Sequence, residues 1–276
     1  MTAERTYRFR DGKELRLGAR TLVMGILNVT PDSFSDGGRW NRRDDALRHM
    51  EEMVHDGADI IDIGAESSRP GFVPMSAAEE IERLLPFLEA VLPECPVPVS
   101  VDTFKAETAR AALAAGAHLL NDIWGLQYAE EPGAMAQAAA EADAPVVIMH
   151  NQNGTAYDGD VIAAMRGFFL RSFEIADAAG LARENIILDP GIGFGKTAEQ
   201  NMHVMRRMDE LISYAGTDYP LLLGASRKSF IGAALDLPVE ERMEATGAAC
   251  VLGITRGASI VRVHDVKPIA RMCRMT

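Results

Sequence analysis

The feature of this sequence that most constrains its fold is a repeated alternation of short apolar runs with longer segments of helical character. Eight runs rich in Val, Ile and Leu lie at residues 21–27, 60–63, 97–101, 118–120, 146–149, 186–188, 221–223 and 260–263. The segments between them include predicted helices at residues 44–56, 76–92, 106–115 and 240–255. The runs are continuously apolar, which is typical of parallel strands buried on both faces beneath helices. Eight strand–helix units in a chain of 276 residues predict an α/β fold, a (β/α)8 TIM barrel, as one domain over residues 1–276.

The segment before the first run predicts a small addition to the barrel. Residues 7–15 alternate in polarity around Asp11 and Gly12, which is typical of a β-hairpin. We expect this hairpin to close the floor of the barrel. No linker or low-complexity tract interrupts the chain, so the sequence indicates no domain boundary.

Charge and cysteine content exclude several classes of protein. The formal net charge of -12, from 28 basic and 40 acidic residues, argues against a nucleic-acid partner. The three cysteines, Cys95, Cys250 and Cys273, form no CxxC pair and indicate neither a disulfide framework nor a thiolate metal site. The sequence contains no apolar stretch long enough to span a membrane and no export signal at its N-terminus. We therefore expect a cytoplasmic protein with no membrane partner.

Polar residues follow almost every apolar run, at the position where the carboxyl-terminal rim of a TIM barrel carries its chemistry. Buried carboxylates and amides are costly unless paired, so these side chains either satisfy one another or bind a ligand with many donors and acceptors. The set comprises Asn28, Asp62, Glu66, Asp102, Asn121, Asp122, His150, Asp189, Ser226, Arg227, Lys228, Arg262 and His264.

Part of this set suits a flat heterocycle. Asp102, Asn121 and Asp189 offer acceptors and one amide, which match a ring edge that presents N–H and NH₂ groups. For each residue, helix capping or a salt bridge at the rim remains an alternative.

The cationic part of the set suits an anion. Lys228 and Arg262 bring positive charge to the same rim and His264 brings a donor, which favours a group such as a phosphate. Here too, a structural ion pair remains an alternative for each residue.

Two loops after the first strands are candidates for ligand contact. Residues 28–38 combine Asn, Asp and Ser with two glycines, and their oxygens are of the kind that Mg²⁺ prefers. Residues 66–71 place Arg69 beside hydroxyl groups and a Pro-Gly turn, a plausible anion clamp that could close over the mouth. Solvated turns without function are the alternative for both.

The glycine-rich stretch at residues 189–196 follows the sixth run. It lacks both the GxGxxG spacing and the Ser or Thr of a GxxxxGK[ST] loop. We interpret it as a tight turn whose backbone lies near a ligand, with Phe194 as an apolar or stacking wall.

Seven motifs together carry a family resemblance. They are MGILNVTPDSFSDGG, DIGAESSRPG, VSVDTFK, the pair Asn121-Asp122, DPGIGFGK, SRK before SFIG, and RVHDV, in this order from about residue 21 to 266. With them the chain resembles the dihydropteroate synthase family. The resemblance implies a TIM-barrel transferase of folate biosynthesis that condenses 6-hydroxymethyl-7,8-dihydropterin pyrophosphate with p-aminobenzoate, a reaction targeted by sulfonamides.

The resemblance also assigns residues to roles. It implies a pterin site of Asp102, Asn121, Met149, Asp189, Phe194 and Lys228. It implies that Asn28 binds the Mg²⁺ of the pyrophosphate and that Arg69, Arg262 and His264 contact the pyrophosphate itself. The p-aminobenzoate pocket would be framed by Phe34, Asp36, Ser68, Pro70 and Ser229. The residues that would act in catalysis are Asp102, Asp189, Lys228, Arg262 and His264.

The implied chemistry begins with carbon–oxygen cleavage and needs no side-chain nucleophile. Mg²⁺ and the cations stabilise the departing pyrophosphate, the dihydropterin stabilises the methylene cation, and the amine then attacks. The chain departs from the family pattern at residues 64–68, at residues 151–160 and at Phe72, where a smaller residue is common.

Two other functions share a pterin-binding barrel: a methyltransferase of corrinoid systems and a non-catalytic pterin-binding module. The presence of Asn28, Arg69, Arg262 and His264 favours the synthase over both. The resemblance further implies a homodimer, for which the Ala/Gly-rich final helical segment could supply a flat interface.

Overall fold

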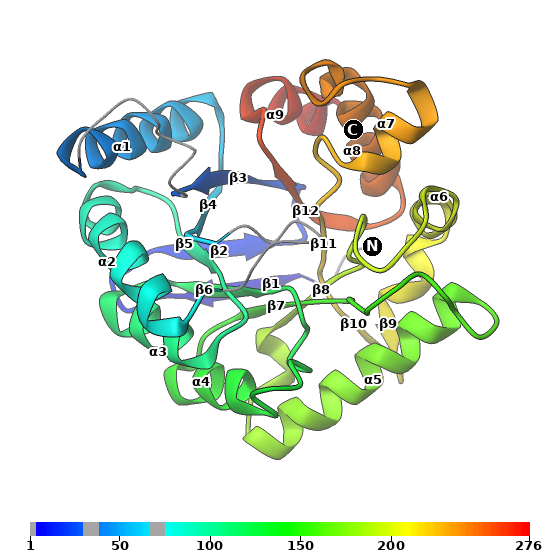
Figure 1. Cartoon of the computed structure of the whole chain (residues 1–276), viewed down its shortest axis with the longest axis horizontal. Helices are drawn as coiled ribbons and strands as arrows, with labels where there is room; N and C mark the ends of the chain where they lie inside the picture. The colour runs from blue at the N-terminus through cyan, green and yellow to red at the C-terminus, as the bar shows by residue number, and fades with distance from the viewer. Residues whose placement is uncertain (1–3, 30–38, 67–74) are drawn as a thin grey trace.

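The computed structural model describes residues 4–29, 39–66 and 75–276, and its core is a closed barrel of eight parallel strands ringed by helices (Figure 1). Neighbouring strands follow the order β11-β12-β3-β4-β5-β6-β7-β8. The barrel strands are β3 (Leu22–Asn28), β4 (Ile60–Gly64), β5 (Val99–Asp102), β6 (Leu119–Asp122), β7 (Val146–Met149), β8 (Ile186–Asp189), β11 (Leu221–Leu223) and β12 (Ala258–Val263). The TIM barrel predicted from the apolar runs is confirmed.

Helices cover the outside of this barrel. They are α1 (Arg39–Asp56), α2 (Ala77–Glu94), α3 (Ala106–Ala115), α4 (Ala134–Ala142), α5 (Val161–Ala179), α6 (Ala198–Arg206), α7 (Ser229–Leu235), α8 (Met243–Thr255) and α9 (Val266–Met275). A short antiparallel pair, β9 (Ser213–Tyr214) and β10 (Thr217–Asp218), precedes β11. None of the described helices is long and apolar enough to cross a lipid bilayer.

Local signals in the sequence explain where several helices begin and end. Ser76 caps α2 through a reciprocal capping box with Glu79. The end of α3 is set by Gly116, which adopts a left-handed conformation with a φ of 109°. By contrast, the helix predicted at 240–255 begins only at Met243, because Val239–Glu241 forms a separate 3-10 turn, η4, after Pro238.

The predicted N-terminal hairpin is present as β1 (Arg5–Arg8) paired with β2 (Glu14–Leu17). Its buried side chains, Tyr7, Leu15 and Leu17, pack in one cluster with inward-facing residues of the barrel strands. The Arg5 guanidinium donates hydrogen bonds to three backbone carbonyls just before or at the start of β8. The hairpin therefore closes the amino-terminal end of the barrel, as expected.

Side-chain alternation divides the barrel interior into an apolar and a polar layer. Met24, Ile60, Leu119, Val147, Ile187, Leu222 and Ile260 join the hairpin in the apolar layer. Two residues further along β4, β6, β8 and β12, the inward positions are polar. Asp102 of β5 is paired in register with Asn121 of β6. The strands thus present polar side chains together at their carboxyl ends, where the chain carries its candidate site.

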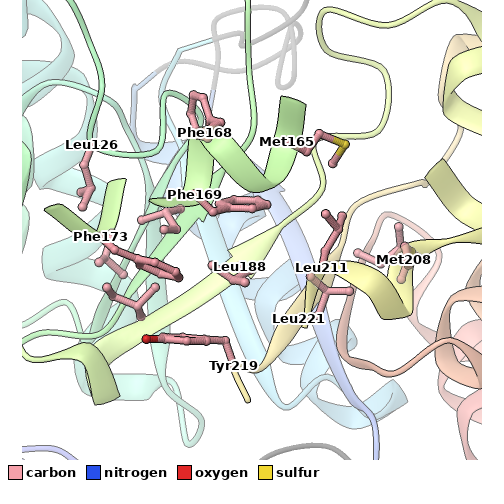
Figure 2. Packing of buried hydrophobic residues seen from close by; sticks show 14 of the residues in the cluster. Leu126, Met165, Phe168, Phe169, Phe173, Leu188, Met208, Leu211, Tyr219 and Leu221 are labelled. Atoms are coloured by element: carbon pink, nitrogen blue, oxygen red, sulfur yellow. The ribbon is translucent and has the colours of Figure 1, made fainter. Parts of the chain in front are cut away.

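The largest core cluster lies between the barrel and its helices (Figure 2). Phe169 and Phe173 of α5 reach toward Leu188 of β8 and Leu221 of β11. The ring of Phe173 stacks on that of Tyr219 with centroids 4.7 Å apart. This packing fixes α5 against the strands that carry the candidate site.

Replacement by alanine should have opposite effects on stability at two glycines within helices. A Cβ on Gly253 of α8 would overlap Cδ2 of buried Leu223, so Gly253→Ala should lower the free energy of unfolding by about 1–3 kcal/mol. A Cβ on Gly167 of α5 would meet only the end of the flexible Arg171 side chain, at 3.7 Å. Gly167→Ala should therefore stabilise the fold by about 0.5–1 kcal/mol. Urea unfolding of both variants measures this, and a stabilising shift in Gly253→Ala would contradict the close packing of α8 on β11.

Candidate functional site

The polar layer contains a buried ion cluster built from three strands and extended by a fourth. Arg262 of β12 donates from Nε to Oδ2 of Asp62, at 2.6 Å, and from Nη2 to Oδ2 of Asp102, at 2.8 Å. Asn121 of β6 adds a bond from Nδ2 to the same Asp62 oxygen, at 3.0 Å. The other oxygen of Asp62, Oδ1, is buried and has no hydrogen-bond partner among the described residues. Within that part of the chain, the cluster thus retains an acceptor that is unpaired.

Burial alters the pKa of Asp102 in this cluster. It raises the pKa of Asp102 to about 7, with Arg262 acting in the opposite direction. Because this pKa is close to neutral pH, a cationic neighbour or ligand decides whether Asp102 is charged.

A second carboxylate and a second cation face the same mouth, from β8 and from the segment after β11. Asp189 is buried and accepts the backbone N–H of Gly191 on Oδ1, at 2.7 Å. The Lys228 ammonium donates to the carbonyl of Ile192 and lies 4.6 Å from the centroid of the Phe194 ring. Burial raises the pKa of Asp189 and lowers that of Lys228 to about 8, and each group opposes the shift of the other.

Gly224 leaves space between these two groups. A Cβ there would lie 3.8 Å from Oδ2 of Asp189 and 3.7 Å from Nζ of Lys228. The backbone of Gly224 therefore lies beside both polar groups.

An apolar cluster lies beside the carboxylates. Met149 is paired in register with Asp189 and packs with Phe104 and Ile123, and Phe194 packs against this cluster. The structure therefore brings together the two predicted wall residues, Met149 and Phe194. Phe104 and Ile123 were not predicted, because a lone apolar residue after a strand gives no distinct signal.

The SRK and RVHDV motifs are joined side by side. Ser226 Oγ lies 3.0 Å from Nδ1 of His264 and accepts the backbone N–H of His264 at 3.2 Å. Arg227 forms a two-pronged ion pair with Asp265, at 2.9 and 2.6 Å. Arg227 has a φ of 56°, an uncommon conformation for this residue type, and the ion pair helps to hold it. The backbone before Lys228 is thereby fixed.

Two polar rim residues have structural roles instead of facing the mouth. Asp122 accepts the backbone N–H groups of Trp124 and Leu126, and burial raises its pKa to about 7. Glu66 pairs with Lys105 and accepts the N–H of Met75 at 2.8 Å. For Asp122 and Glu66 the structure therefore favours the alternatives to ligand binding, namely bonds to backbone N–H groups and an ion pair.

The buried Lys105 cluster was not predicted from the sequence. Lys105 pairs with both Glu66 and Glu80, and Thr108 donates to Glu80 at 3.0 Å. This cluster ties the end of β4 to α2 and α3 beneath the rim. Lys105 lies in the VSVDTFK motif, but nothing in that motif identifies its partners.

The structure describes Asn28 and Ser229 but not five other predicted site residues. Asn28 is half-buried at the end of β3, opposite Gly64 of β4, and Ser229 is the exposed first residue of α7. Five predicted positions lie outside the described residues: Phe34, Asp36, Ser68, Arg69 and Pro70.

Another hollow among the described residues lies away from this rim. It is a groove of about 990 Å³ at the amino-terminal end of the barrel, beside residues 18–21 and 254–259. Two of its arginines are already paired, Arg20 with Asp59 and Arg256 with Asp209. The carboxyl-terminal rim remains the candidate site because buried charges and an unpaired buried acceptor of the described chain converge there.

The chain is similar to known proteins along most of its length. A family described as pterin binding enzyme matches residues 24–264. The chain is 53% identical over 256 residues to a dihydropteroate synthase of Bacillus subtilis, covering 93% of this chain and 87% of the relative. It is 48% identical over 268 residues to a dihydropteroate synthase of Clostridium beijerinckii, covering 96% of each.

Solved structures agree with the sequence comparison. A dihydropteroate synthase of Clostridium difficile, solved in the presence of pteroic acid, superposes with a TM-score of 0.89 at 48% identity, covering 94% of this chain and 96% of that one. The Xanthomonas albilineans dihydropteroate synthase with 4-aminobenzoic acid also gives a TM-score of 0.89, at 38% identity and covering 98% and 97% of the two chains.

Proposed function

This chain belongs to the dihydropteroate synthase family of pterin-binding enzymes, and we propose that it condenses 6-hydroxymethyl-7,8-dihydropterin pyrophosphate with p-aminobenzoate. The products are 7,8-dihydropteroate and pyrophosphate, and the reaction serves folate biosynthesis. The methyltransferase and the non-catalytic module are not favoured, since relatives at about half sequence identity over nearly the whole chain are synthases.

One observation carries the proposal: the carboxylates of Asp102 and Asp189 and two cations converge at the rim beside an apolar wall. Asp102, Asn121 and Asp189 supply acceptors and an amide for the N–H and NH₂ edge of a pterin. Met149 and Phe194 supply apolar surface for its faces. Lys228, opposite Asp189, completes the proposed pterin site.

The pyrophosphate would bind nearer to β12. Within the described residues the Arg262 guanidinium uses Nε and Nη2 in its carboxylate bonds, and arginine has five N–H donors in all. Donors therefore remain to meet a phosphate oxygen, and His264 lies two residues further along the chain. We assign Arg69 to the same group on the resemblance alone, because it lies outside the described residues.

A Mg²⁺ ion fits the residues at this rim on chemical grounds. Mg²⁺ is commonly held by one or two protein oxygens together with substrate phosphates and water. Asn28 offers an amide oxygen at the end of β3, next to β4 with the Asp62 oxygen that is unpaired among the described residues. When bound, the ion would neutralise charge on the pyrophosphate leaving group.

The chain's own side chains would then act by charge. Asp102 and Asp189 lie where negative charge can stabilise a cationic pterin once its carbon–oxygen bond breaks. Arg262 and His264 would hold the departing pyrophosphate. The amine of p-aminobenzoate would attack from the side framed by Ser229 and the undescribed positions Phe34, Asp36, Ser68 and Pro70.

We also propose a cytoplasmic homodimer that sulfonamides inhibit. A Yersinia pestis dihydropteroate synthase, 42% identical, was solved as a sulfonamide drug complex. The dimer is supported by Leu235 and Val239, which are 54% and 44% exposed at the connection from α7 to α8. The glycines of α8 contribute nothing to that face, since Gly247 and Gly253 pack against Met272 and Leu223 within the chain.

The synthase is tested by pyrophosphate release from dihydropterin pyrophosphate and Mg²⁺, with and without p-aminobenzoate. We expect release that depends on p-aminobenzoate and equals the amount of dihydropteroate formed, measured by chromatography of the product. Tight pterin binding without turnover would instead indicate a binding module.

A further inference from the structure

Lys196 ends the glycine-rich turn at residues 189–196 and carries a buried amine. The residue is 8% exposed. Its Nζ donates to the carbonyl oxygens of Gly191 and Phe194, each at 3.0 Å, and lies 2.9 Å from Nδ1 of His150. Burial lowers the pKa of Lys196 to about 7. In its ammonium form Lys196 has three N–H donors, and these three acceptors occupy all of them. Lys196 therefore joins two points of the turn to the residue that follows β7.

The partner imidazole is an uncharged acceptor. Burial, assisted by the charge of Lys196, lowers the pKa of His150 to about 2. The ring is held edge-on to Phe168, with centroids 4.9 Å apart. The backbone N–H of His150 also donates to the carbonyl of Asp189, at 2.9 Å. His150, the residue that Lys196 contacts, is thus held both by the ring of Phe168 and by the backbone of Asp189.

The same short turn holds both polar groups of the proposed pterin site. The N–H of Gly191 donates to Oδ1 of Asp189, while its carbonyl accepts from Lys196. Lys228 donates to the carbonyl of Ile192 and lies over the ring of Phe194. The backbone carbonyl of Phe194 in turn accepts a hydrogen bond from Lys196. Any movement of this turn would therefore displace Asp189 and Lys228 together.

We propose that Lys196 is a positioning residue for pterin binding: by holding Gly191 and Phe194 it fixes the backbone that orients Asp189 and Lys228. This inference rests on the proposed function, in which those two residues bind the pterin. None of the hydrogen bonds of Lys196 within the described residues is made to Asp189 or Lys228, so it acts through the turn. A misplacement of about 1 Å in a site of this kind costs up to about 100-fold in activity.

The test compares Lys196→Met, which removes the three donors, with Lys196→Arg, which keeps charge and donors. A control, Leu88→Ala, removes buried apolar contacts in α2, on the opposite side of the barrel from β8. Steady-state kinetics for each substrate, direct pterin binding followed by fluorescence, and urea unfolding are measured for all three and for the wild type.

Lys196→Met should raise the KM for dihydropterin pyrophosphate and lower kcat, each by about 10-fold, with the KM for p-aminobenzoate within about 2-fold of wild type. Lys196→Arg should recover part of this loss. Leu88→Ala should lose stability but keep both KM values. If Lys196→Met yields no folded protein, Lys196→Gln should show the same selective loss at smaller size.

Normal pterin kinetics in Lys196→Met, an equal rise in both KM values, or the same pattern in Leu88→Ala would overturn the positioning role. Absence of turnover by the wild type would contradict the proposed synthase instead. In that case the dissociation constants for 6-hydroxymethylpterin decide the inference, and equal values in wild type and Lys196→Met would refute it.

Discussion

Replacing Asp189 by asparagine should weaken pterin binding by about 100-fold, the largest loss of affinity that we expect from a change of so few atoms. The amide would keep its oxygen on the N–H of Gly191, where Oδ1 of Asp189 lies at 2.7 Å. Its NH₂ group would then take the place of Oδ2 and present a donor to the donors of the pterin. Lys228 would at the same time lose its facing carboxylate.

Isothermal titration with a pterin ligand measures this change. Asp177→Asn is a matched control, because Asp177 pairs with Arg183 on the exposed surface and such pairs contribute little. We expect the control to bind as the wild type does. Near-normal affinity in Asp189→Asn would remove Asp189 from the pterin site.

Replacing Arg262 by alanine should have two separable effects. Binding of dihydropterin pyrophosphate should fall more than binding of the bare pterin, because the guanidinium is proposed to contact the pyrophosphate. The free energy of unfolding should fall by about 3–5 kcal/mol, since the buried Asp62 and the nearly buried Asp102 would both lose their cation. An equal loss of affinity for both ligands would indicate a purely structural role.

The stability loss should depend on pH in a predictable direction. Arg262 lowers the pKa of Asp102, so its removal raises that pKa further above its unfolded value. A carboxyl with a raised folded pKa is stabilising when protonated, and this contribution disappears as pH rises through the folded pKa, which is about 7 even with Arg262 present. The variant should therefore be less destabilised at about pH 5 than at about pH 8. Adding Asp62→Asn should restore part of the stability and none of the pyrophosphate affinity.

The sequence predicted the barrel well because each strand is a local apolar signal. The runs at 146–149 and 221–223 coincide with β7 and β11. Some of the polar residues after the strands, Asp62, Asp102, Asn121 and Arg262, do meet in one cluster. Helix ends were less predictable where two local signals compete, as at Pro238 and Met243.

The partners within the site could not be predicted, because they join residues far apart in the chain. Asp62 and Arg262 are 200 positions apart, and their pairing follows only from the closure of the barrel. Lys196 was grouped with a turn, but its contact with His150 depends on how β7 and β8 lie side by side. The roles assigned to the pterin, pyrophosphate, metal and p-aminobenzoate residues all stay predictions.

The position of Arg262 late in the chain has a consequence for the stage of synthesis at which the site forms. Asp62 and Asp102 are synthesised before Arg262, which belongs to β12, the last of the barrel strands in chain order. A nascent chain that stops before β12 lacks both the strand that completes the ring and the charge that balances the two carboxylates. Ligand-binding competence should thus arise in one late step of synthesis, when closure of the ring and neutralisation of the cluster coincide.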